Sequence, residues 1–168
     1  MEETKKITSW QLDNLSLPGR FFHLAQAYLE CSHYLLDSII GKSMRLTFSH
    51  VQVVGFLFEH SLELFLKGAI TQAESKRTNT HKLNQLYNEF KKLYPGKKFR
   101  FIGKIGEICE KDKQLPYSEF HRYPVDKSGN LWVPSFYNLH LWKSQLSFFK
   151  GDYERLIPLI KGENSCSE

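Results

Sequence analysis

The sequence predicts an all-α fold: an antiparallel four- to five-helix bundle with a short extended or β-hairpin insertion before the last long helix. The main evidence is that apolar residues recur every three or four positions in four separate segments, which is the spacing of one buried helical face. The chain has 168 residues, the size of one ordinary domain. It contains no internal repeat and no low-complexity linker, so we expect residues 1–168 to form a single domain.

The first long helix is predicted at about residues 18–40. Pro18 suits a first helical turn, and Gly41 suits the position just past the end of the helix. We expect its buried face to consist of five residues at three- or four-residue spacing: Phe21, Leu24, Tyr28, Cys31 and Leu35.

The second helix, at about residues 50–73, is apolar over most of its circumference, which predicts a central position in the bundle. Ser49 and Gln52 match a capping box, with Ser49 as the N-cap. Glu63 and Lys67 have the spacing and order of a favourable helical ion pair.

The remaining elements are shorter until the last one. Thr80 is a plausible N-cap for a third helix that Pro95-Gly96 ends, and a short helix follows near Ile105. A turn at residues 126–129 predicts a hairpin over about 119–123 and 130–133, with an extended loop as the alternative. Ser135 is expected to cap the last long helix, which Gly151-Asp152 could bend.

Composition excludes several classes of protein. An apolar fraction of 41% and a charged fraction of 24% exclude wholesale disorder. The lack of a run of about 18 apolar residues predicts no membrane span. The N-terminus is charged and lacks an apolar signal stretch, and the three cysteines are widely spaced. We therefore expect a cytoplasmic protein.

No cofactor or metal is predicted. Glu30 and His33 form a single Glu-x-x-His pair, whereas a di-iron bundle needs two such pairs and further carboxylates. Phosphate-binding loops and the signatures of serine hydrolases, zinc ribbons and kinases are absent from the sequence.

The net charge of +5 comes largely from one stretch without acids. Its cations are Lys91, Lys92, Lys97, Lys98, Arg100 and Lys104, with Tyr94, Phe99 and Phe101 between them. Cations beside rings that can stack are what a surface for phosphates and bases needs. We interpret Lys97, Lys98, Arg100 and Lys104 as candidate ligand-binding residues. The alternative is a solvated loop that lysines keep soluble.

Two arginine–histidine clusters are candidate catalytic sites. Arg45 and His50 form an Arg-x4-His, in which Arg45 could grip a phosphate and His50 could shuttle a proton. The second cluster contains His121, Arg122 and Tyr123, of which Arg122 and Tyr123 are also candidate ligand contacts. In the alternative interpretation, the first cluster is a helix-capping segment, and the second is an insertion whose charged side chains are exposed to solvent.

The order of the helices resembles the HEPN family of prokaryotic helical domains. The resemblance rests on "LELFLKG" with Glu63 and Lys67-Gly68, on His81-Lys82-Leu83 at the start of the third helix, and on FHRYPVDKSG. It covers about residues 17–160. It implies a helical bundle, often a homodimer, in toxin–antitoxin or other defence systems, where a nucleotidyltransferase or an antitoxin protein would be the partner.

Many HEPN proteins are metal-independent ribonucleases with an Arg-x4-6-His motif near the last long helix. Here the histidine after Arg122 is His140, which is outside that spacing, and Arg45 and His50 precede the second helix. We therefore expect a non-catalytic module that binds RNA, a nucleotide or another phosphate-rich partner. The alternatives are a metal-independent endoribonuclease using Arg45, His50, His121 and Arg122, and a pure dimerisation or protein-interaction domain.

Overall fold

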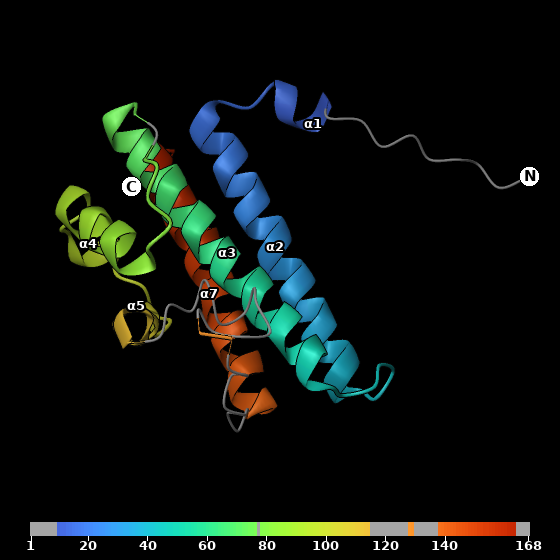
Figure 1. Ribbon diagram of the computed structural model, residues 1–168. Coiled ribbons are helices and arrows are strands. Elements are labelled where there is room, and N and C mark those ends of the chain that lie inside the picture. Colours follow the sequence, from blue (N-terminus) through green and yellow to red (C-terminus); the bar gives the residue numbers. More distant parts are fainter. Residues whose placement is uncertain (1–9, 77, 115–127, 130–137, 164–168) are drawn as a thin grey trace, which may run out of the picture.

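The computed structural model describes residues 10–76, 78–114, 128–129 and 138–163, and every regular element within these ranges is a helix (Figure 1). The all-α prediction is thus confirmed for the described residues, and the predicted hairpin lies outside them. The helices are α1 (Trp10–Asp13), α2 (Leu17–Ile40), α3 (Phe48–Glu74), α4 (Leu83–Leu93), the 3-10 turn η1 (Lys97–Phe99), α5 (Ile105–Gln114) and α7 (Leu139–Lys161).

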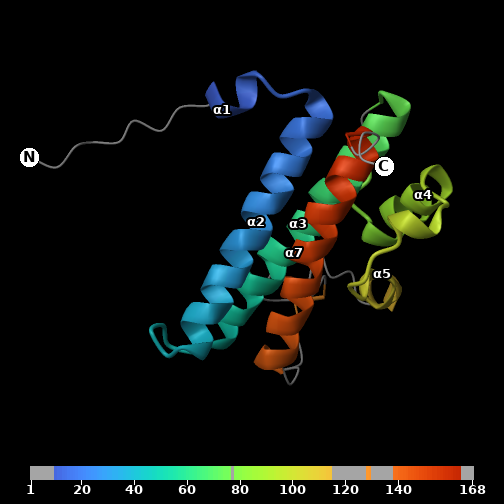
Figure 2. The ribbon, with the colours of Figure 1, turned by 180° about the vertical axis from the view of Figure 1, so that it is seen from behind.

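The three long helices α2, α3 and α7 contact one another, and α4 packs against α3 on one flank with α5 next to it (Figures 1 and 2). Helix α2 runs opposite to both of its partners, whereas α3 and α7 run in the same direction. Helices α2 and α3, which follow one another along the chain, are therefore antiparallel. A short loop would make α7 antiparallel to α3. The chain between α3 and α7 is instead long enough to return to the end of the molecule where α3 begins, so the two helices can run in the same direction.

The N-cap residues of the long helices differ from those predicted for α3 and α7, and α2 has an N-cap that was not predicted. The N-cap of α3 is Thr47, whose hydroxyl accepts from the His50 N–H, so Ser49 lies inside the first turn. The N-cap of α7 is Asn138, which accepts from the Leu141 N–H, and not Ser135. Helix α2 has Ser16 as its N-cap, with Pro18 in the first turn and Gly41 as the C-cap, as predicted for the latter two.

Helix α4 begins without a side-chain cap, because its N-cap is Lys82 and not Thr80. The Thr80 hydroxyl instead accepts from the Lys82 N–H and donates to the Gln85 side chain at 2.7 Å. Helix α7 continues through Gly151-Asp152 without a break.

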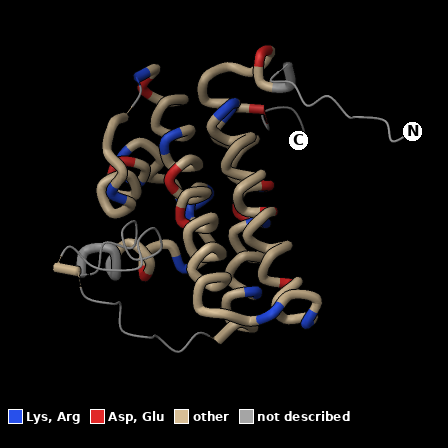
Figure 3. The backbone as a smooth tube through the Cα atoms, turned by 45° about the vertical axis from the view of Figure 1, so that its right-hand side comes forward, with Lys and Arg blue, Asp and Glu red and all other residues tan. Residues whose placement is uncertain are grey.

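Helix α3 is central, as predicted: every residue from 61 to 71 is buried. Phe65 lies at the centre of the aromatic core, where its ring stacks on Tyr153 with centroids 4.4 Å apart and meets Phe22 at 5.6 Å. Acidic and basic positions are interspersed along the described helices (Figure 3). Within the described part of the chain, none of these helices is both long enough and apolar enough to cross a membrane.

The predicted buried face of α2 is only partly correct: Phe21, Tyr28 and Leu35 are partly buried and pack against the core, whereas Leu24 and Cys31 are exposed. The fully buried face is shifted by one residue and consists of Gly19, Phe22, Ala25, Leu29, Ser32, Leu36 and Ile39. Both sets have helical spacing, and the polar Ser32 is buried where the predicted face has Cys31. Ser32 is nevertheless buried because its hydroxyl donates to the Val54 carbonyl at 2.9 Å.

Candidate functional site

The candidate binding site is the segment of residues 97–104, called the basic segment below, which joins α4 to α5. The four predicted ligand-binding residues here, Lys97, Lys98, Arg100 and Lys104, are all exposed. Lys104 pairs with Glu107 at 3.0 Å on the surface. The other three cations form no ion pair with any described residue, so their charge is available to an anionic ligand.

Two side chains of α7 fix the backbone of the basic segment. The Arg155 guanidinium donates to the carbonyl oxygens of Lys98 and Arg100, both at 2.6 Å. The Asp152 carboxylate, which is fully buried, accepts from the N–H groups of Ile102 at 2.9 Å and Gly103 at 2.8 Å. Arg155 and Asp152 also pair with each other at 2.8 Å. The exposed cations therefore stand on an ordered backbone.

Close packing adds to this order. A Cβ atom at Gly103 would lie 2.9 Å from the Phe149 ring, so only glycine lets the basic segment approach α7 this closely. Phe101 packs into the core, with its ring 5.4 Å from that of Phe65.

Phe99 and Tyr94 are half-buried and pack on each other with centroids 5.0 Å apart. The rings between the cations thus take part in the packing that supports the basic segment.

Arg45 and His50 lie in the connection between α2 and α3 and at the start of α3. The His50 Nδ1 atom is 2.8 Å from the Arg45 carbonyl oxygen and 2.9 Å from the Thr47 hydroxyl. Because a carbonyl only accepts, Nδ1 is assigned the proton and Nε2 is the basic nitrogen. His50 therefore holds the connection in place, while the Arg45 side chain is exposed.

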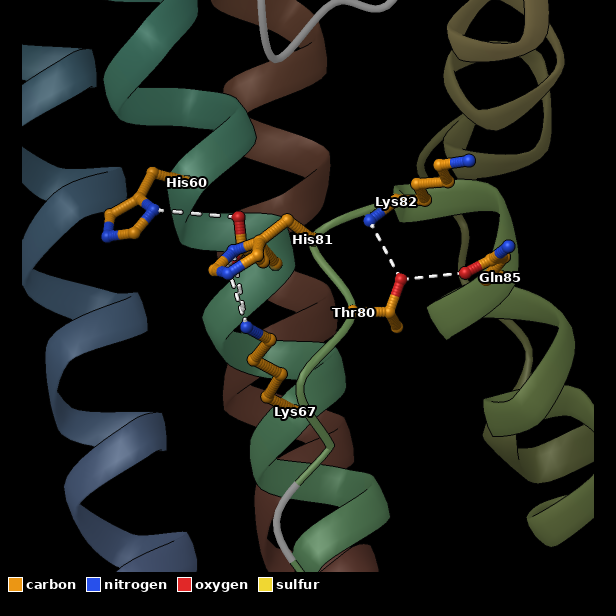
Figure 4. A network of polar contacts seen from close by, with 7 residues as sticks. His60, Lys67, Thr80, His81, Lys82 and Gln85 are labelled. Atoms are coloured by element: carbon orange, nitrogen blue, oxygen red, sulfur yellow. Dashed lines mark hydrogen bonds and ion pairs between the residues drawn. The ribbon is translucent and has the colours of Figure 1, made fainter.

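A buried network around Glu63 was only partly anticipated. Glu63 accepts from Lys67 at 2.9 Å and from His81 at 2.8 Å, and His60 lies 3.8 Å away (Figure 4). The Glu63–Lys67 pair confirms the predicted spacing, but both residues are buried. Nothing in the sequence pattern indicated that His81, from the chain before α4, would reach this carboxylate.

Electrostatics explain why Glu63 tolerates burial. Desolvation alone would raise its pKa, but the contacts with His60, Lys67 and His81 and the positive charge of Lys67 outweigh it. They lower the pKa of Glu63 from 4.5 to about 2. Glu63 is thus charged at neutral pH, and we interpret the network as a tether between α3 and the chain leading into α4.

The other predicted site residues, His121, Arg122 and Tyr123, lie outside the described residues. Within the described ranges, no three His, Cys, Asp or Glu side chains form a group that could hold a metal ion. His33 lies 3.5 Å from the Ser147 hydroxyl, and Glu30 is exposed.

Comparison with known proteins finds no matching family model, no matching curated protein and no matching solved structure. The HEPN resemblance therefore stays a prediction from the sequence motifs.

Proposed function

We propose that this chain is a HEPN-like, non-catalytic module that binds RNA through the phosphates, using the basic segment. The observation that supports it is the combination of three cations that form no ion pair with any described residue, Lys97, Lys98 and Arg100, with a backbone that Asp152 and Arg155 hold in place. A prearranged set of cations loses less conformational entropy on binding than a flexible one.

The packing also indicates which groups of an RNA the basic segment would contact. Phe99 and Phe101 are partly buried and pack on other rings, which leaves less of their surface for the stacking of bases. Lysine and arginine contacts to phosphates carry no sequence information directly. We therefore expect binding that tolerates many RNA sequences and weakens steeply with salt.

The test is the salt dependence of single-stranded RNA binding by a K97A/K98A/R100A variant. We expect weaker binding and a slope of log K against log salt that is smaller by about 2, because each lost phosphate contact removes roughly 0.7. A K76A/K82A/K161A variant, with the same charge change at other exposed lysines, should stay close to the wild type. Equal losses in both variants would show that only net charge matters.

A metal-independent endoribonuclease is the second candidate, and the orientation of His50 favours it. With Nδ1 held by the Arg45 carbonyl, Nε2 is the nitrogen that would take a proton from a ribose 2′-OH. RNA cleavage in EDTA that is lost in H50A, R45A, H121A or R122A would replace the binding proposal with this one. We expect no cleavage.

A homodimer is the third element of the proposal. Leu17, Leu24 and Cys31 are exposed at seven-residue spacing on α2, which places them along one side of the helix. A second copy covering this side would hide apolar surface from water. If RNA binding fails, a dimerisation or partner-holding domain, with an antitoxin or nucleotidyltransferase partner in a defence system, is the function that remains.

A further inference from the structure

A second candidate site lies at the opposite end of the long helices from the C-terminus of α7. A cavity of about 630 Å³ opens where α2 ends, where the connection to α3 runs, and where α7 begins. Its lining includes the apolar residues Ile40, Met44 and Leu46. The same lining also includes three nitrogen-bearing side chains, those of Lys42, Arg45 and His140.

The charge around this cavity is one-sided. The described lining contains no aspartate or glutamate. Lys42 and Arg45 are exposed and form no ion pair with any described residue. The last acid of α2, Asp37, is already paired with Lys143 at 2.7 Å. An anion entering the cavity would therefore meet two cations that no described carboxylate neutralises.

The connection that carries these cations is well anchored. The Met44 N–H donates to the Ser38 carbonyl at 3.1 Å, and the Ser43 hydroxyl donates to the same oxygen at 3.0 Å. His50 holds the Arg45 carbonyl from the other end of the connection. The backbone at Lys42 and Arg45 is thus fixed before any ligand arrives, which reduces the entropy lost on binding.

We propose that this cavity binds a small organic phosphate monoester, with the phosphate held by Lys42, Arg45 and His140 and an apolar or aromatic body against Ile40, Met44 and Leu46. Arginine can contact two phosphate oxygens at once, and imidazole supplies a further N–H donor. The volume lies within the range of about 300–1,000 Å³ that is usual for small-molecule sites. The proposal does not rest on RNA binding by the basic segment.

The test is calorimetric titration with adenosine 5′-monophosphate, adenosine and inorganic phosphate. We expect the monophosphate to bind at least about tenfold more tightly than either of its parts, because each part makes only one of the two kinds of contact. Adenosine binding as tightly as the monophosphate would overturn the role of the cations. Inorganic phosphate binding as tightly would overturn the role of the apolar residues.

Two variants locate the site. R45A and K42G should each weaken monophosphate binding about tenfold or more, since each removes a charge-assisted contact. Glycine is chosen at residue 42 because Lys42 has a φ of 59°, a conformation that glycine adopts without strain. K76A/K82A/K161A, at exposed lysines outside both candidate sites, should bind the monophosphate as the wild type does. Unchanged binding in R45A and K42G, with thermal unfolding also unchanged, would overturn the proposal.

Discussion

The Asp152 Oδ2 atom accepts a hydrogen bond from the backbone N–H of Gly103 at 2.8 Å, although Asp152 has no exposed surface. The same carboxylate accepts from Ile102 and pairs with Arg155. A buried carboxylate is tolerated when such donors surround it. One acidic side chain in the last helix therefore fixes the segment that carries the proposed RNA contacts.

We expect Asp152→Ala to lower the free energy of unfolding by about 2–4 kcal/mol. It removes charge-assisted hydrogen bonds, leaves two backbone amides without their acceptor, and takes from Arg155 its carboxylate partner. Urea denaturation followed by circular dichroism would measure the change. Glu154→Ala, at an exposed neighbouring position, is the control and should shift the midpoint little.

The same substitution has an informative effect on RNA binding. Removing an acid normally strengthens binding to a polyanion, as we expect for Glu154→Ala. Asp152→Ala should instead weaken it, because the basic segment loses its support. Tighter RNA binding by a folded Asp152→Ala variant would contradict the view that order in this segment contributes to affinity.

The Glu63 network predicts a loss of stability in acid. Contacts with His60, Lys67 and His81 hold the pKa of Glu63 at about 2 in the folded protein, below the ordinary value of 4.5. A lowered folded-state pKa contributes stability above the unfolded pKa, and this contribution is lost as the pH falls from about 5 towards 2. We expect it to be about 2 kcal/mol at neutral pH.

The measurement is the difference in unfolding free energy between the wild type and Glu63→Gln at several pH values. The difference should be largest near pH 7 and should shrink steadily below pH 5. Glu154→Gln, which changes an exposed acid, should show no such trend. If the difference in unfolding free energy for Glu63→Gln were independent of pH, the charge of Glu63 would contribute nothing to the stability of the fold.

Periodicity predicted which segments are helical, because burial of one side repeats every three to four residues. It predicted the buried side of α2 only in part, because Phe21, Tyr28 and Leu35 pack against the core but Leu24 and Cys31 do not. Leu24 and Cys31 have the same spacing as the buried Ala25 and Ser32, and only the position of α3 and α7 distinguishes the two sides.

The hydrogen bonds by which α7 holds the basic segment were not predictable from the sequence either. The residues that form them, Asp152 and Arg155, are about 50 positions from Gly103 along the chain. Glycine and aspartate are poor helix formers, so from the sequence Gly151-Asp152 is a place where the last helix could bend. Asp152 is tolerated inside the helix because its carboxylate accepts hydrogen bonds from the backbone N–H groups of Ile102 and Gly103.

The end of α3 contains a strained residue. Ser75 is the C-cap, with φ 55° and ψ 19°, a left-handed conformation that favours glycine. We expect Ser75→Gly to raise the unfolding free energy by about 0.5–1 kcal/mol, because glycine adopts this conformation without strain. Thermal or urea unfolding would measure it, with Ser43→Gly, at a residue that has no positive φ, as the comparison. A lower stability for Ser75→Gly would contradict the reason given.

From the exposed apolar side of α2 we predict a homodimer, and we expect one charged substitution on this side to dissociate it. Leu24 is 37% exposed and lies one heptad after Leu17 and one before Cys31. Light scattering at micromolar concentration should give about twice 19.7 kDa for the wild type. Leu24→Asp should give 19.7 kDa with the same helical spectrum, because a buried charge without a partner opposes association. Ile102→Asp, at a residue that is 67% exposed on the basic segment, should remain dimeric. If the wild type is a monomer at every concentration tested, the homodimer is excluded and the exposed side of α2 must serve a different partner.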